Sequence, residues 1–194
     1  MHYLQTGYIT IKKQEKLDSE NIYTLSYPNL EVKKSLNRYI LKTLSQVSIS
    51  HRTKTQINIR KALATGDVER INENFHSFFA SIPHDWYRKN RISEYEGYYA
   101  SVFYAYFTAS GLDVIAEDTT NHGRIDLTIV CKDKIYIIEF KVIEVDKTKG
   151  SALEQIKSKN YSGKYQGKGK KIYLIGIEFS KEDKNIKNFM WEEK

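Results

Sequence analysis

The sequence predicts an α/β fold, with a mixed central sheet and flanking helices, preceded by a smaller N-terminal region of strands and helices. From residue 91 onward, helical periods and short runs of β-branched and aromatic residues follow one another in the order α-β-β-β-α-β. Before residue 90, an alternating opening segment is followed only by helical periods. The change of pattern near 82–92 therefore predicts two parts, residues 1–90 and residues 91–194.

The N-terminal part is predicted to open with a β-hairpin. Residues 7–11 and 21–26 alternate and are rich in β-formers, so we expect two strands that pair across the charged loop 12–20. The spacing of apolar residues then predicts three helices, at 30–44, 56–64 and 68–81. Asp67 precedes the third helix, where an aspartate side chain can cap the first free N–H groups.

The second part is predicted to begin with a helix over 93–110, in which Ser93 and Glu96 have the spacing of a capping box. A tight turn at 131–134 joins the second and third strands of this part. The remaining segments are predicted as strands at 113–117, 125–130, 135–141, 171–179 and 185–191 and a helix at 151–160.

Composition excludes several classes of protein. The single cysteine, Cys131, cannot form an intrachain disulfide, which indicates a reducing compartment. Without a leader pattern or a long apolar run, we expect a cytoplasmic protein with no membrane partner. The five histidines lack zinc-ligand spacing. Aromatic residues at helical spacing in 75–79 and 98–107 are expected to fill the core.

Two carboxylates and a lysine are predicted to meet on neighbouring strands. Glu139 and Lys141 are two residues apart on one strand and share a face. A two-residue turn that pairs Cys131 with Lys134 puts Asp126 opposite Glu139. Mg²⁺ or Mn²⁺ would remove the repulsion between these carboxylates and bind phosphate oxygens. The set predicts phosphodiester hydrolysis; the alternative is that Glu139 and Lys141 form an ordinary ion pair at a strand end.

Short motifs around these residues extend the pattern. The segments are GRIDL (123–127), IIEFK (137–141), EGYY (96–99) and ALEQI (152–156), followed by Tyr161. Together they resemble the PD-(D/E)xK nuclease superfamily, in the branch that carries this domain behind an AAA-ATPase-like domain. The resemblance implies a restriction-endonuclease-like α-β-β-β-α-β core for residues 91–194.

The resemblance extends toward the N-terminus, with two departures. QTGYITI (5–11) and YTLSYPN (23–29) are similar to the segment that joins the ATPase-like domain to the nuclease. Ile125 stands where the superfamily often has proline. No GxxxxGK[ST] phosphate loop occurs, so we expect no ATPase site in this sequence. The sequence would then be either a fragment of a longer protein or a homologue that lost the ATPase-like domain, which could still act as a partner.

The resemblance also implies a role for each matched side chain. Asp126, Glu139 and Glu96 would ligate Mg²⁺ or Mn²⁺, and Lys141 would assist the attacking water. Gln155 would position the substrate or the lysine. Two alternatives stay open, because Glu96 also fits the cap of its own helix and Gln155 also fits an exposed helix surface.

The charge balance is compatible with nucleic acid. Lys and Arg exceed Asp and Glu by 31 to 24, a net charge of +7. Flexible lysines can meet phosphates and tyrosines can stack on bases, although a solvated loop is the alternative. The candidates are Arg124, His122, Lys164, Lys168, Lys170 and Tyr161.

The sequence thus predicts a metal-dependent nuclease, with DNA favoured over RNA by the resemblance alone. The alternative function is a binding module, weakly catalytic or not catalytic, that works with an AAA-ATPase-like partner. Assembly of identical chains is compatible with either function.

Overall fold

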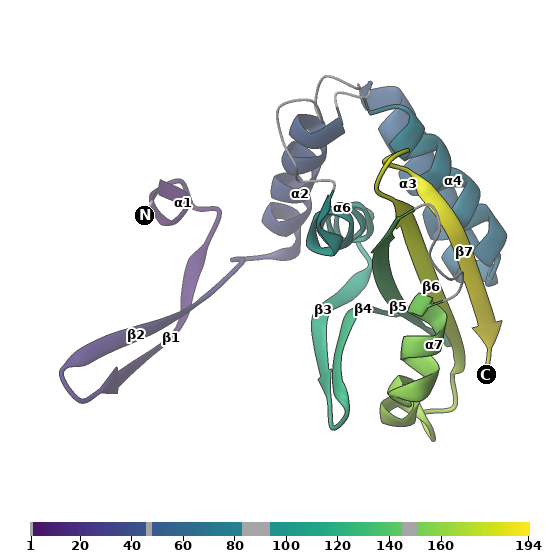
Figure 1. Cartoon of the computed structure of the whole chain (residues 1–194). Coiled ribbons are helices and arrows are strands. Elements are labelled where there is room, and N and C mark those ends of the chain that lie inside the picture. The colour runs from purple at the N-terminus through teal and green to yellow at the C-terminus, as the bar shows by residue number, and fades with distance from the viewer. Residues whose placement is uncertain (1, 46–47, 83–93, 145–150) are drawn as a thin grey trace.

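A computed structural model describes residues 2–45, 48–82, 94–144 and 151–194 of the chain. It confirms the predicted α/β class: a five-stranded mixed sheet lies between helices, and a β-hairpin with further helices precedes it (Figure 1). Among the described residues, no helix is long and apolar enough to cross a membrane.

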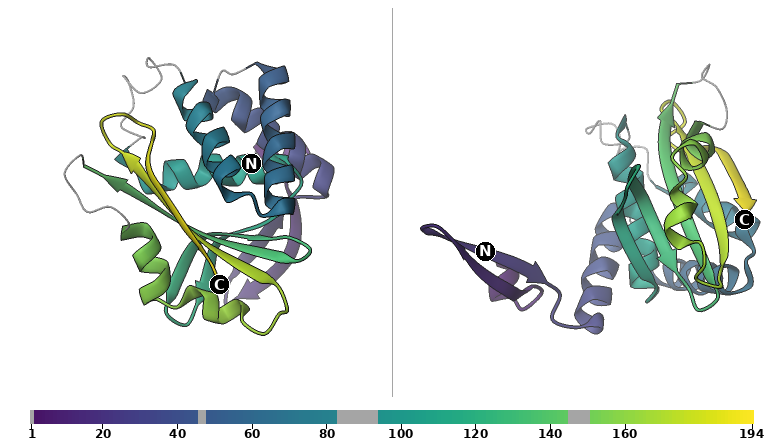
Figure 2. Two further views of the ribbon diagram at one scale, coloured as in Figure 1. Left: turned by 90° about the vertical axis from the view of Figure 1, so that its right-hand side faces the viewer. Right: turned by 90° about the horizontal axis from the view of Figure 1, so that it is seen from below.

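The central sheet has the strand order β3-β4-β5-β6-β7. Its strands are β3 (Asp113–Thr120), β4 (Gly123–Val130), β5 (Lys134–Ile143), β6 (Lys171–Ser180) and β7 (Ile186–Glu193). Neighbours are antiparallel except β5 and β6, which are parallel. The connection between these two contains α7 (Ser151–Ser158) and the short 3-10 helix η2 (Tyr161–Tyr165), which lie on one face of the sheet (Figure 2).

The opposite face of the sheet is covered by helices from both halves of the sequence. They are α3 (Ile49–Thr65), α4 (Val68–Ala80) and α6 (Glu96–Ala109), and α2 (Leu30–Ser45) packs against α6. Phe75 of α4 stacks on Phe103 of α6, with ring centroids 3.7 Å apart. The predicted role of the aromatic residues as core is confirmed, and one hydrophobic cluster includes side chains from all four helices.

The alternation of β5 builds two cores from one strand. Phe140 packs against Phe103, 4.9 Å between centroids, on the side of α6. Ile135 and Ile137 pack against Leu153 of α7 on the other side. Glu139 follows the same alternation as these isoleucines, so its place near α7 results from the period of the strand.

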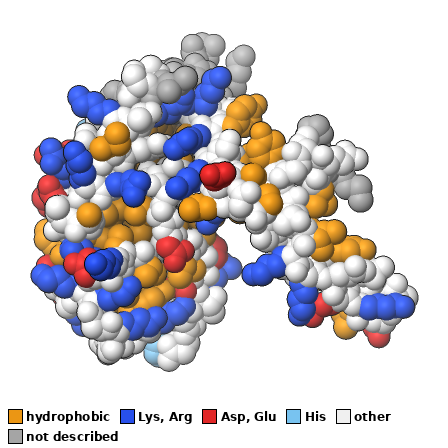
Figure 3. Space-filling model, turned by 180° about the vertical axis from the view of Figure 1, so that it is seen from behind, with side chains coloured by type: hydrophobic (Ala, Val, Ile, Leu, Met, Phe, Trp, Pro, Cys, Tyr) orange, Lys and Arg blue, Asp and Glu red, His pale blue; other side chains and the backbone are white. Residues whose placement is uncertain are grey.

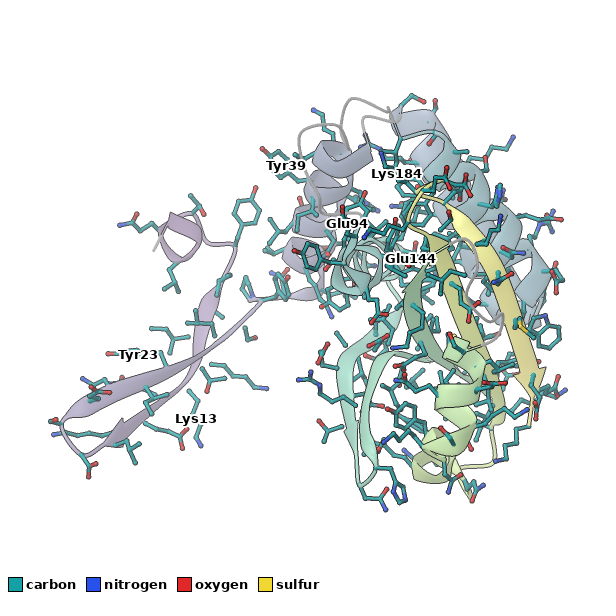
Figure 4. All side chains as sticks on the ribbon, in the orientation of Figure 1. Lys13, Tyr23, Tyr39, Glu94, Glu144 and Lys184 are labelled. Atoms are coloured by element: carbon teal, nitrogen blue, oxygen red, sulfur yellow. The ribbon has the colours of Figure 1, made fainter. Side chains whose placement is uncertain are left out.

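The N-terminal hairpin differs from its prediction in one respect. It consists of β1 (Thr10–Leu17) and β2 (Glu20–Ser26), after the short helix α1 (His2–Gln5). The charged segment expected as a loop is mostly strand. A two-stranded ribbon that is exposed on both faces can present charged side chains to water on either face, so no charge has to be buried. The hairpin projects from the body (Figure 2), and Lys13 and Tyr23 extend into solvent on it (Figure 4).

Helix ends were predicted with mixed success. The Asp67 side chain accepts the Arg70 N–H at the start of α4, as predicted. α3 begins at Ile49, earlier than expected, because its first turns lack a clear apolar period. α6 begins at Glu96 with Tyr95 at its N-cap, so the expected start at Ser93 is wrong. Ser93 itself lies outside the described residues, as do Pro83 and all of the predicted boundary near 82–92 except Ile82.

Candidate metal and active site

Asp126 is held against the backbone of the neighbouring strand. The β4–β5 pairs, from Val130 with Ile135 to Leu127 with Ile138, have the register that the turn predicted. Beyond the last pair, Asp126 Oδ2 accepts the Phe140 N–H at 2.8 Å. The carboxylate therefore lies beside residues 139–141 of β5, as the predicted register requires.

Glu139 is a buried carboxylate with one unpartnered oxygen. Its side chain is 2% exposed, and Gln155 Nε2 donates a hydrogen bond to Oε1. Oε2 has no hydrogen-bond partner among the described residues. Burial, and secondarily the nearby Asp126 carboxylate, raise the pKa of Glu139 to about 8. An unbalanced negative charge at this depth costs several kcal/mol, which a cation would offset.

α7 approaches the sheet closely enough for Gln155 to reach Glu139. Gly176 of β6 is the register partner of Glu139 and lies directly beneath the backbone of α7. The N-terminus of α7 is fixed by Glu178, a buried residue that accepts hydrogen bonds from Ser151 Oγ at 2.9 Å and Ala152 N at 3.2 Å. Gln155 therefore faces the sheet, not solvent.

Glu96 connects α6 to the end of β5. Its Oε1 accepts the Val142 N–H at 3.3 Å, and its Oε2 lies 3.5 Å from Lys141 Nζ. The helix that begins at Glu96 thus directs this carboxylate across to β5, where it holds the lysine beside Asp126 and Glu139. All five residues predicted for the catalytic group are gathered in this region.

Glu117 belongs to the same region and was not singled out from the sequence. The β3–β4 pairs on either side of it, Ala116 with Leu127 and Asp118 with Ile125, place it across from Asp126. Burial raises the pKa of Asp126, and Glu117 adds to this effect. The register of β3 and β4 is the signal that could have identified Glu117. The strand predicted over 113–117 ended before the β3–β4 turn, so it did not define that register.

Several side chains predicted to contact nucleic acid have partners inside the protein. Lys164 is paired with the buried Asp118, which also accepts from Tyr165 and Thr128. Lys170 donates to the Cys131 carbonyl oxygen at 2.9 Å. These lysines anchor the loop that follows α7.

Other candidates for nucleic-acid contact differ in exposure. Tyr161 is 2% exposed and packs in the core beneath α7, where its ring has no open face on which a base could stack. Lys168 Nζ lies 4.5 Å from the centroid of the Tyr165 ring. Arg124 forms a 2.6 Å ion pair with Glu117, and His122 is exposed at the β3–β4 turn.

The residues present fit a divalent cation held partly by water. Among the described residues, no cluster of three or more His, Cys, Asp or Glu side chains has the geometry to hold a metal ion. Mg²⁺ needs only one or two carboxylates, with waters and phosphate oxygens completing six positions. Asp126 and the unpartnered oxygen of Glu139 meet that need.

Glu139 is expected to make the metal-free protein less stable as the pH rises. Its folded pKa of about 8 exceeds its ordinary value of 4.5, so the folded state binds its proton more tightly. This contribution is complete below the ordinary value and is lost as the pH passes the folded value. Urea unfolding in EDTA from pH 5 to pH 8 should show a fall of a few kcal/mol.

The matched control for the pH dependence is Glu139→Gln, which keeps the size of the side chain and removes its proton equilibrium. Subtracting its profile cancels the groups that do not interact with Glu139, and what is left is the joint titration of Glu139 and the neighbouring Asp126. Asp118 does not contribute a slope in this window, because its hydrogen bonds to Lys164 and Tyr165 outweigh burial and lower its pKa. Equal slopes in both proteins would contradict the assignment.

Two comparisons with known proteins bear on this site. A model of the PD-(D/E)XK nuclease superfamily matches residues 94–189, a range that includes Glu96, Asp126, Glu139, Lys141 and Gln155. An "uncharacterized protein in vnfD 5'region" of Azotobacter chroococcum mcd 1 is 46% identical over 189 residues, 97% of this chain. The chain spans 36% of the length of that relative.

Proposed function

We propose that the protein is a metal-dependent nuclease that hydrolyses phosphodiester bonds, because residues 94–189 match a model of the PD-(D/E)XK nuclease superfamily. One observation carries the proposal beyond the family: a buried glutamate with an unpartnered oxygen lies beside a second carboxylate and a lysine. A carboxylate held in an ordinary ion pair would have a lowered pKa, whereas burial and the Asp126 carboxylate raise the pKa of Glu139.

Each residue of the group has a distinct task in this function. Asp126 and Glu139 would hold Mg²⁺ or Mn²⁺, with Glu96 as an additional carboxylate at the rim. A bound divalent cation supplies an acidified water and stabilises negative charge on the phosphate. The backbone N–H of Phe140 orients Asp126, and Gln155 orients Glu139. Lys141, held by Glu96, orients the attacking water or stabilises developing charge.

DNA is the proposed substrate on the ground of the family resemblance alone, while the net positive charge of +7 favours the binding of any nucleic acid. Lys and Arg side chains are spread over the surface of the body and the hairpin (Figure 3). A partner such as an AAA-ATPase-like domain remains part of the proposal.

Replacing Lys141 with Ala is expected to lower cleavage about 10²–10³-fold, the usual effect of removing one group that stabilises transition-state charge. The measurement is cleavage of single- and double-stranded DNA and RNA with Mg²⁺, Mn²⁺ or EDTA. Lys171→Ala is the matched control, since Lys171 also forms an ion pair, with Glu193, but lies at the opposite end of the parallel strands.

The same experiment separates the nuclease from a non-catalytic binding module. Metal-dependent cutting that Lys141→Ala lowers and Lys171→Ala does not supports the proposal. If the wild type cuts none of the four substrates and calorimetry detects no Mg²⁺ or Mn²⁺ binding, the nuclease proposal fails. Metal binding without cutting would indicate that a partner or another substrate is required.

A further inference from the structure

A second candidate site lies between α2 and α3, outside the nuclease domain. A cavity of about 430 Å³ is lined there by Arg38, Tyr39, Leu41, Lys42, Arg52, Thr53 and Gln56. Three of these described lining residues carry positive charge and none carries negative charge. Such a volume falls within the usual range of small-ligand pockets.

The floor of the cavity carries a buried cation. Arg52 is 8% exposed, and its Nη1 has no hydrogen-bond partner among the described residues. Tyr106 is close by, but burial raises the pKa of its hydroxyl, which therefore stays neutral and does not balance the charge. A buried guanidinium whose hydrogen bonds are incomplete is costly, so an anion in the cavity beside Arg52 would offset part of that cost.

The rim of the cavity adds exposed groups on the same side. Arg38 and Lys42 are one helical turn apart on α2, so both side chains can reach a ligand in the cavity. Tyr39 is 65% exposed and projects from α2 (Figure 4). Arginine matches phosphate oxygens with paired N–H donors, and an exposed aromatic ring can stack on a base.

We propose that this α2–α3 cavity binds the phosphate group of a nucleotide, with Arg52 at its floor and Arg38 and Lys42 at its rim. The nucleotide is either free or one unit of a nucleic-acid strand, since both present the same phosphate. The site is independent of metal and of Glu139, so it does not rest on the nuclease proposal.

Isothermal titration calorimetry on the full chain in EDTA tests the site with two probes, AMP and a dT oligonucleotide. The variant Arg38→Gln/Lys42→Gln is expected to bind at least one probe about tenfold to a hundredfold more weakly, since it removes two charged hydrogen-bond donors. Arg60→Gln/Lys61→Gln on α3 is the matched control, with the same change of charge at exposed positions outside the cavity.

The outcomes distinguish the two sources of the phosphate. A selective loss of AMP affinity supports a free nucleotide, and a selective loss of oligonucleotide affinity alone supports a strand. The proposal is overturned if the cavity variant binds each probe with the same affinity as the control variant. Arg52→Met gives a second measurement: a probe that binds the wild type should raise its Tm and leave that of the variant unchanged.

Failure of this proposal is separable from failure of the nuclease proposal. The probes are titrated in EDTA, where the metal-dependent cleavage of the proposed nuclease is absent. A loss of probe binding in Arg38→Gln/Lys42→Gln and a loss of cleavage in Lys141→Ala are therefore read out in separate experiments.

Discussion

Glu139→Gln is expected to abolish metal-dependent cleavage, by about 10³-fold or more, while making the metal-free protein more stable. Removing a carboxylate that we propose as a metal ligand would forfeit several kcal/mol of charge stabilisation in the transition state. The same change removes a buried negative charge whose pKa is raised to about 8 by burial and by Asp126. An amide of the same shape can still accept the hydrogen bond from Gln155.

Cleavage is expected to fall while the stability of the metal-free protein rises, so this variant is more informative than one that only loses activity. Urea unfolding in EDTA at pH 8 measures the stability, and calorimetry with Mn²⁺ measures the metal affinity. Glu154→Gln on α7 is the matched control. Glu154 is exposed, so this substitution makes the same chemical change at a position outside the site. Reduced stability in Glu139→Gln would show that the carboxylate is a structural ion-pair partner, and would contradict its role as a metal ligand.

Gly176→Ala is expected to push α7 away from the sheet, which costs about 1–3 kcal/mol of stability and detaches Gln155 from Glu139. A Cβ at this position would lie 2.9 Å from Leu153 Cα and 3.0 Å from the carbonyl carbon of Ala152. Both are backbone atoms of the helix, so rotation of a side chain cannot relieve the contact. Cleavage should fall together with stability.

The matched control for Gly176→Ala is Gly97→Ala in α6. A Cβ on Gly97 meets nothing within 4 Å, and alanine in a helix is favoured over glycine by about 0.5–1 kcal/mol. Chemical unfolding of the two variants should therefore show shifts of opposite sign. A Gly176→Ala protein with unchanged stability and cleavage would show that the close approach of α7 is not needed.

The register of β4 and β5 shows what local chemistry can predict. The short turn between Cys131 and Lys134 determines which residues pair, and the hydrogen bond from Cys131 N to the Lys134 oxygen, 2.8 Å, closes it as expected. The proximity of Asp126 to residues 139–141 follows directly. The prediction of a helix start at Ser93 was wrong because it used a local capping pattern. Glu96 accepts its hydrogen bond from the N–H of Val142, which is far along the chain and cannot be found from local spacing.

The sequence by itself determined the order of helices and strands, the two faces of β5 and the proximity of Asp126, Glu139 and Lys141, because these depend on residue period and a short turn. The tertiary structure alone decided that Glu117 joins the site, that Tyr161 is buried, and that Arg52 lines a cavity with a buried Nη1 that has no hydrogen-bond partner in the described part of the chain. Burial and charge balance depend on which distant segments pack together, and single-residue patterns do not contain that information.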